Sequence, residues 1–168
     1  MNSTLTTPHL LLKALEEQDR ETMIRLLGDR EIGKTYMLPV FQSKQQADAY
    51  FDRLVVLCQT RFVFGIYLPD GELIGMLNEC GCTEDEIELG YFISTAHQGR
   101  GYATEALQAA IQECFLCGFR HVVAGFFEEN PASRRVMEKC GMHPLNRESV
   151  ISYQGRDHCC LYMGVDRE

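Results

Sequence analysis

The stretch STAHQGRGYATEA, residues 94–106, joins two segments of different periodicity and decides how the rest of the chain is interpreted. Before it, Ile87, Leu89 and Ile93 fall on every second position, the spacing that is typical of a strand. After it, apolar residues recur at helical spacing in a run without Gly or Pro, namely Ala103, Ala106, Leu107, Ala110, Ile111 and Cys114. The stretch therefore predicts the end of a strand, a tight glycine loop and the first turn of a helix.

The predicted glycine loop suits a bound phosphate. The first backbone N–H groups of a helix have no partner within the helix, and the helix dipole adds partial positive charge at that end. Gly99 and Gly101 lack the Cβ atoms that would hold an anion away. Glycines between a strand and a helix also serve as a plain turn, so on this physics alone either role is open.

Two motifs carry a family resemblance. Residues Gln98-x-x-Gly101-x-Ala103 resemble the Gln/Arg-x-x-Gly-x-Gly/Ala signature of the GNAT superfamily of N-acetyltransferases, which bind acetyl-CoA. The segment NPASRRVMEKCGM, residues 130–142, is similar to a later motif of that family, an Asn followed by a short helix and a Lys-x-Gly-Phe ending. The opening TPHLLLKAL, residues 7–15, and the pair Gly90-Tyr91 further resemble the RimJ/RimL-like branch, whose named members acetylate the N-termini of ribosomal proteins.

The resemblance implies a fold and a coenzyme site. The implied fold is α/β (α+β), with a mixed, mostly antiparallel twisted sheet of about seven strands flanked by about four helices. Two neighbouring strands, residues 86–94 and 121–127, would splay apart, with the pantetheine arm of acetyl-CoA in the gap and the pyrophosphate at the glycine loop. Backbone N–H groups of Phe92 and Ile93 would hold the carbonyl oxygen. The other residues implied to contact the coenzyme are Gln98, Gly99, Arg100, Gly101, Tyr102, Ala103, Thr104, Asn130 and Ser133.

Acetyl transfer to an amine needs a base, because amines with pKa values of about 8 to 10 are mostly protonated near neutral pH. We predict that Glu88 is this base, since it lies on the strand that precedes the loop, two residues before Gly90. Strand alternation places Glu86 and Glu88 on one face and the apolar Ile87 on the other. The alternatives are Glu86 or water as the base, and a solvated acidic run over residues 84–88 with no catalytic role.

The proton donor for the leaving thiolate is unassigned by the sequence. Many GNAT enzymes have a tyrosine seven residues after the motif asparagine, whereas this chain has Met137 there. Ser133, water or Tyr162 are the candidates, and a thiolate with a thiol pKa of about 8.5 can leave without an acid. The missing tyrosine keeps open a second function, a non-catalytic acetyl-CoA-binding regulatory domain.

The remaining segments predict an alternation of strands and helices in one domain spanning residues 1–168, with its core over about residues 8–166. Ser43 is expected to cap a helix, Asn130 and Pro131 to open another, and Gly28 to end the first. Tyr36 and Phe41 lie in a loop-like segment, where they either pack or contact the acceptor. The other expected strands are residues 9–15, 62–68 and 73–77, and a closing hairpin of residues 151–153 and 159–165.

Composition excludes several classes of function. The formal net charge of −8 and the lack of a basic stripe argue against nucleic-acid binding and fit an amine-bearing acceptor. No apolar run approaches the roughly 18 residues of a membrane helix, and no export signal is apparent, so a cytoplasmic protein without a membrane partner is expected. The eight cysteines lack the spacing of a zinc site and are interpreted as reduced thiols, so no metal is expected.

These observations predict an N-acetyltransferase that uses acetyl-CoA as cosubstrate and a primary amine as acceptor, by direct attack in a ternary complex. The acceptor is either a peptide N-terminus or a small-molecule amine, and the protein is either a monomer or a homodimer. A nucleotide-binding domain is disfavoured, because no Walker lysine follows the glycines and no acidic residue stands where a Rossmann ribose partner would.

Overall fold

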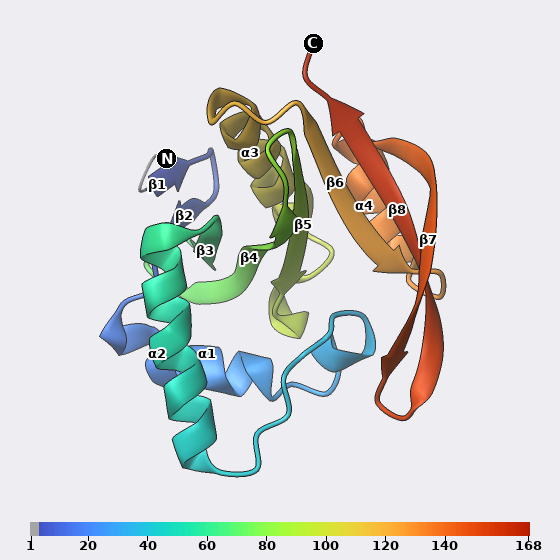
Figure 1. Cartoon of the computed structure of the whole chain (residues 1–168). Coiled ribbons are helices and arrows are strands. Elements are labelled where there is room, and N and C mark those ends of the chain that lie inside the picture. The colour runs from blue at the N-terminus through green and yellow to red at the C-terminus, as the bar shows by residue number, and fades with distance from the viewer. Residues whose placement is uncertain (1–3) are drawn as a thin grey trace.

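The computed structural model describes residues 4–168, which form one eight-stranded sheet with four α-helices packed against it (Figure 1). The strands are β1 Thr4–Thr6, β2 Leu11–Lys13, β3 Val63–Tyr67, β4 Leu73–Cys82, β5 Glu86–Ile93, β6 His121–Phe127, β7 His143–Tyr153 and β8 Arg156–Asp166. The helices are α1 Arg20–Leu27, α2 Lys44–Thr60, α3 Tyr102–Leu116 and α4 Pro131–Lys139, with short 3-10 turns η1 Glu17–Asp19, η2 Ile32–Lys34 and η3 Thr95–His97.

The sheet has the order β1-β2-β3-β4-β5-β6-β8-β7. The β5–β6 pair is parallel and the other neighbours are antiparallel. The predicted mixed, mostly antiparallel sheet is therefore confirmed, with eight strands where about seven were expected.

Helices cover both faces of this sheet. Helices α3 and α4 lie on one face and α1 and α2 on the other (Figure 1). On the α3 side, Ile87 and Leu89 of β5 are 0% and 1% exposed and belong to the same core cluster as Leu107 of α3. Each such buried aliphatic side chain stabilises the fold by about 1.5–3 kcal/mol. The predicted alternation of β5 is confirmed, because Glu86 and Glu88 point to the opposite face from these core residues.

The glycine loop and helix α3 form as the sequence predicts. Gly101 is the N-cap of α3 with φ of +85°, and Gly99 has φ of +73°. This left-handed region favours glycine, because a side chain there crowds the backbone. In the apolar stripe of α3, Ala106, Leu107, Ala110 and Cys114 are fully buried. The burial of this stripe sets the direction in which the N-terminus of α3 faces.

Helix α4 is capped as expected. The side-chain oxygen of Asn130 accepts a hydrogen bond from the Ser133 backbone N–H at 3.2 Å, and Pro131 occupies the first turn. Gly141, with φ of +79°, follows the end of the helix. The cap places the Asn130 end of α4 beside strand β6, from which the chain has just emerged.

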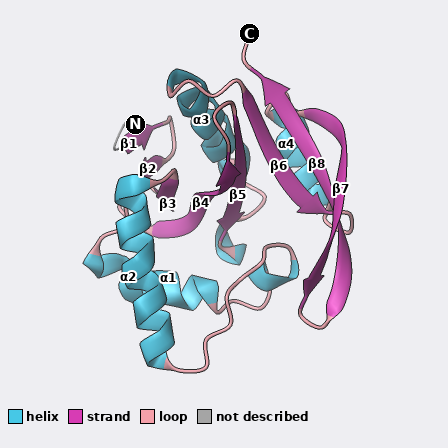
Figure 2. Cartoon of the chain, in the orientation of Figure 1, coloured by secondary structure: helices cyan, strands magenta, loops and turns pink. Residues whose placement is uncertain are grey.

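Strands β5 and β6 pair over a short distance and then separate. Glu86–Glu88 pair with His121–Val123, and no pairing follows, although β6 continues to Phe127 and β5 to Ile93. Figure 2 shows the two arrows diverging beyond this point. The predicted splay between residues 86–94 and 121–127 is thus confirmed.

Three elements differ from the sequence-based expectation. Strand β2 covers only Leu11–Lys13 of the expected 9–15, and β1 precedes it in an antiparallel pair. Strand β7 begins at His143, eight residues before the expected start, and β8 extends to Asp166. The first six residues of β7 are all exposed, so they show no apolar alternation that would have identified a strand. Among residues 4–168, none of the helices is both long enough and apolar enough to cross a bilayer.

Candidate active site

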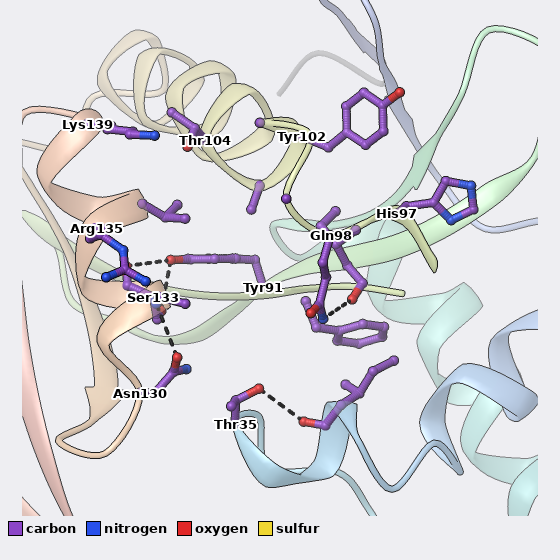
Figure 3. Close-up of a pocket in the computed structure, with 18 residues that line it drawn as sticks. Thr35, Tyr91, His97, Gln98, Tyr102, Thr104, Asn130, Ser133, Arg135 and Lys139 are labelled. Carbon is purple, nitrogen blue, oxygen red and sulfur yellow. Dashed lines mark hydrogen bonds between the residues drawn. The ribbon is translucent and has the colours of Figure 1, made fainter. Parts of the chain in front are cut away.

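A cavity of about 400 Å³ opens where β5 leaves β6, between the glycine loop, helix α4 and the segment that follows α1 (Figure 3). Ten of the predicted site residues line it: Phe92, Ile93, Gln98, Gly99, Gly101, Tyr102, Ala103, Thr104, Asn130 and Ser133. Two do not. Arg100 is exposed and does not line the cavity. Glu88 lies at the last position where β5 and β6 are still paired.

The glycine loop forms one end of the cavity with an open backbone. A Cβ atom built on Gly99 or Gly101 would meet nothing within 4 Å, so the glycines leave free space beside the start of α3. The Gln98 side chain donates to the Ile93 carbonyl oxygen at 2.9 Å, which fastens the loop to the end of β5. The first amides of α3 therefore face an accessible space in which an anion can bind.

Two hydroxyl groups meet deeper in the cavity. The Tyr91 hydroxyl oxygen lies 3.0 Å from Oγ of Ser133, so β5 and α4 are joined across the splay. Burial raises the pKa of the Tyr91 phenol above its ordinary value. Figure 3 shows Tyr91, Ser133 and Asn130 close together on the α4 side of the cavity.

The backbone of β5 presents alternate amides to the gap. Ser94 N donates to Ile74 O at 2.7 Å, and Ile93 stands opposite Gly75 in the β4–β5 register. In an antiparallel ladder, hydrogen-bonded and non-bonded pairs alternate, so the amide of Phe92 points to β4 and that of Ile93 to the gap. Phe92 instead contributes its ring to the cavity wall, with its centroid 5.1 Å from that of Tyr36.

Glu88 lies on the other face of the sheet from α3. Its side chain is 25% exposed, and its Oε2 is 3.5 Å from Nη2 of Arg147, whose Nη1 is 2.9 Å from Glu86 Oε1. Burial raises the pKa of Glu88, the Arg147 guanidinium opposes this, and Glu86 adds to it. Glu86 is held by the closer ion pair, so Glu88 is the less tightly paired of the two carboxylates.

The segment between α1 and α2 forms a wall of the cavity on the side of the sheet that carries Glu88. Ile32 and Thr35 line it, and the Tyr36 hydroxyl donates to Asn78 Oδ1 at 2.5 Å. Tyr153 of β7 donates to the Tyr36 carbonyl oxygen at 3.3 Å and so ties this segment to the closing hairpin. Phe41 packs against the ring of Tyr50, with centroids 5.4 Å apart. Tyr36 thus packs behind Phe92 without lining the cavity, and Phe41 packs against Tyr50 of α2.

Sequence reasoning missed several side chains at the cavity. Tyr91, His97, Arg135 and Lys139 line it. In the sequence, Tyr91 contributed only to the family resemblance, and the other three residues carried no signal of a role at the site. Met137 is 1% exposed and packs in the core under α3 and α4, so it does not reach the cavity. A different candidate donor, Tyr162, is bonded to Ser149 through hydroxyl oxygens 3.0 Å apart and is not part of the lining.

The cysteine thiols are poor nucleophiles near neutral pH. Burial, with a smaller contribution from Glu88, raises the pKa of Cys80 to about 11, and burial raises that of Cys140 to about 12. Over residues 4–168 the structure contains no cluster of three or more His, Cys, Asp or Glu side chains arranged for a metal ion. The polar groups that line the cavity include hydroxyls, backbone amides, the His97 imidazole and the cations of Arg135 and Lys139.

Comparison with known proteins agrees with this geometry. The family model described as an acetyltransferase (GNAT) domain matches residues 9–143. An uncharacterized N-acetyltransferase of Bacillus subtilis (strain 168), YoaA, is 28% identical over 153 residues, which cover 88% of this chain and 85% of the relative.

Solved structures share the fold. RimL, an alpha-N-protein acetyltransferase of a ribosomal protein solved in complex with coenzyme A, has a TM-score of 0.84 at 17% identity and covers 97% of each chain. Spermidine N-acetyltransferase from Vibrio cholerae, solved with CoA and spermine, has a TM-score of 0.80 at 20% identity and covers 95% of this chain and 96% of its own. Since the family model spans most of the chain and includes the glycine loop, the splay and α4, the protein belongs to the GNAT acetyltransferase family.

Proposed function

We propose that the protein transfers an acetyl group from acetyl-CoA to a primary amine by direct attack in a ternary complex. The observation that carries this proposal is the continuity of the cavity. It runs from the glycine loop, past Tyr91 and Ser133 at the splay, to Ile32 and Thr35 on the segment after α1. A coenzyme entering at the loop and an acceptor entering at that segment would meet where β5 and β6 separate.

The cavity fits the coenzyme's chemistry. Acetyl-CoA supplies a thioester at one end of a long arm and phosphates at the other. Gly99 and Gly101 leave room for the pyrophosphate at the N-terminus of α3, where backbone N–H groups and the helix dipole favour an anion. The gap between the splayed strands exposes backbone groups that can bond to the arm as an added strand would. Arg100, exposed beside the loop, adds a cation at its rim.

Glu88 is the proposed base, acting on the amine through water. It lies at the last paired position of the splay, on the face that carries the segment after α1. Its raised pKa makes it a stronger proton acceptor than an ordinary carboxylate, while Arg147 limits the rise and keeps the ionised form available. The Ile93 amide, which faces the gap, is the proposed donor to the developing oxyanion.

The Tyr91–Ser133 pair is the proposed source of the proton for the leaving thiolate. Ser133 lies at the first turn of α4 with the Tyr91 hydroxyl beside it, and a phenol carries its proton near neutral pH. Tyr91 is thus proposed to supply the phenol that many GNAT enzymes have at the position of Met137. This weakens the alternative of a non-catalytic coenzyme-binding domain, for which the missing tyrosine was the main argument.

Direct attack is favoured over an acetyl-enzyme intermediate. An acetyl-cysteine route needs a thiolate at the splay, and the high pKa of Cys80 leaves its thiol protonated near neutral pH. The acceptor class is an amine, because RimL acts on a protein N-terminus and the Vibrio cholerae enzyme on spermidine. The net charge of −8, with Glu88 at the position where the strands separate, favours a cationic acceptor.

An acceptor panel tests the proposal. Release of free thiol from acetyl-CoA is measured with polyamines, other small amines and peptides of varied N-terminal sequence, and products are identified by mass. We expect thiol release that depends on one class of amine and yields an equal amount of acetylated acceptor. Tight binding of acetyl-CoA with no turnover across the panel would instead support the regulatory domain.

A further inference from the structure

Helix α4 presents two cations to the cavity. Arg135 and Lys139 both line it, and because they are four residues apart they lie on the same side of the helix. Figure 3 shows the Lys139 side chain extending from α4 toward Thr104 of α3, and Arg135 lying nearer to Ser133. Lys139 thus faces the start of α3 from the opposite wall of the cavity.

Contacts between the helices hold the Lys139 end of α4 near the start of α3. The Gln108 side chain donates to the Lys139 carbonyl oxygen at 3.2 Å, and Cys140 Sγ donates to the Thr104 carbonyl oxygen at 3.5 Å. Both partners lie in the first two turns of α3. Lys139 is about 13 Å along the helix axis from Asn130, at 1.5 Å per residue. Lys139 therefore lies toward the outer end of the cavity, away from the Tyr91–Ser133 pair, and Arg135 lies one helical turn closer to that pair.

Neither cation is neutralised within the part of the chain that the structure describes. Their neighbour Arg134 forms an ion pair with Glu138 at 2.9 Å, whereas Arg135 and Lys139 pair with no carboxylate, although the chain holds 24 acidic residues. Like charges four residues apart on a helix repel each other. A bound dianion would convert this repulsion into two favourable contacts.

We propose that Arg135 and Lys139 bind the 3′-phosphate of the coenzyme, so that helix α4 distinguishes CoA from 3′-dephospho-CoA. This inference rests on the proposed function, because it takes the glycine loop as the site of the pyrophosphate. The loop amides, the helix dipole of about half a positive charge and Arg100 at the rim are assigned to the pyrophosphate, so the separate phosphate monoester of about −2 charge needs other cations. A guanidinium fork and an ammonium group are the side chains that bind such a group.

Calorimetric titration with two coenzymes tests the proposal. CoA and 3′-dephospho-CoA are titrated into the wild type, the double variant Arg135→Gln/Lys139→Gln and the control Arg134→Gln, which removes a cation from the same helix but outside the cavity. All three positions are exposed or partly exposed, and thermal unfolding confirms that the variants fold. We expect the wild type to bind CoA about tenfold or more tightly than 3′-dephospho-CoA. The double variant should lose this preference, and Arg134→Gln should keep it.

The outcomes separate this inference from the proposed function. Equal loss of affinity for both coenzymes in the double variant would assign the two cations to the pyrophosphate and overturn the inference. A wild type that binds both coenzymes equally well would overturn it too, and in that case the proposed function still stands. If the wild type binds neither coenzyme, both the proposed function and the inference fail.

Discussion

The hydroxyl oxygen of Tyr91 lies 3.0 Å from Oγ of Ser133, which joins strand β5 to helix α4 at the point where β5 has separated from β6. Asn130, the N-cap of α4, fixes Ser133 through its backbone N–H, and the register of β5 with β4 fixes Tyr91. The two hydroxyls are therefore positioned by elements on either side of the gap. We therefore expect substitution of either hydroxyl to have a similar effect on activity.

Tyr91→Phe should lower kcat by about tenfold to a hundredfold and leave acetyl-CoA affinity nearly unchanged, because only the proton donor is removed. Ser133→Ala is expected to have a similar effect. If the two act in one relay, the double variant will be no slower than the worse single variant. Steady-state rates with a true acceptor, combined with calorimetry, check this. Additive losses would mean that the two hydroxyls work independently.

Glu88→Gln should lower kcat/KM by about a hundredfold or more at neutral pH, the usual scale for a general base. Acetyl-CoA affinity should change little, because Glu88 lies outside the cavity lining. Part of the rate should return at high pH, where the amine loses its proton unaided. Glu86→Gln is the matched comparison on the same strand face. An unchanged rate in Glu88→Gln with a large loss in Glu86→Gln would transfer the role to Glu86.

Arg147→Gln should shift the acidic limb of the kcat/KM profile to higher pH. Glu88 acts when ionised, so the rate rises as pH increases through its pKa, which burial has already raised. Arg147 lowers that pKa, and its loss therefore raises it further. Arg120→Gln is the control, because it removes an equal charge from an exposed arginine paired with Asp85. If the acidic limb of the kcat/KM profile does not shift in Arg147→Gln, this limb does not report the ionisation of Glu88.

Gly101→Glu should abolish acetyl-CoA binding while the chain still folds. The new side chain has open space but brings a negative charge to the proposed pyrophosphate site, and the φ of +85° adds strain of about 1–2 kcal/mol. Gly118→Glu is matched in strain, since Gly118 has φ of +104° and open space, but it lies at the far end of α3. Both variants should lose similar thermal stability, and calorimetry should show lost binding only for Gly101→Glu.

The sequence predicted two kinds of element: strands with one face in the core, and helices whose capping residues are neighbours in the sequence. Strand β5 alternates because one face packs in the core, and α4 begins at an Asn-Pro pair whose cap needs only neighbouring residues. The expected start of β7 at residue 151 was wrong, because the strand begins at His143 and its first half is exposed on both faces. Its pairing with β8 is decided by the fold, with little contribution from its own pattern.

The site was predicted where backbone conformation defines it and missed where tertiary packing does. Gly99 and Gly101 have positive φ, a backbone conformation that the presence of glycine in the sequence already indicates. Tyr91, by contrast, meets Ser133 from 42 residues away, and nothing in either local segment indicates this contact. Lys139 reaches the cavity because α4 packs on α3. Such contacts follow from the arrangement of the sheet and helices, which a single sequence specifies only indirectly.

The central claim is that the acetyl group passes directly from acetyl-CoA, bound in the cavity, to an amine. It is tested by loading the protein with acetyl-CoA labelled in the acetyl group and then mixing it rapidly with an acceptor found in the panel. The account predicts that intact protein carries no covalent label before mixing, and that label then appears in the acceptor within a single turnover. Label found on the protein before mixing and then passed to the acceptor, or no transfer at all, would contradict it.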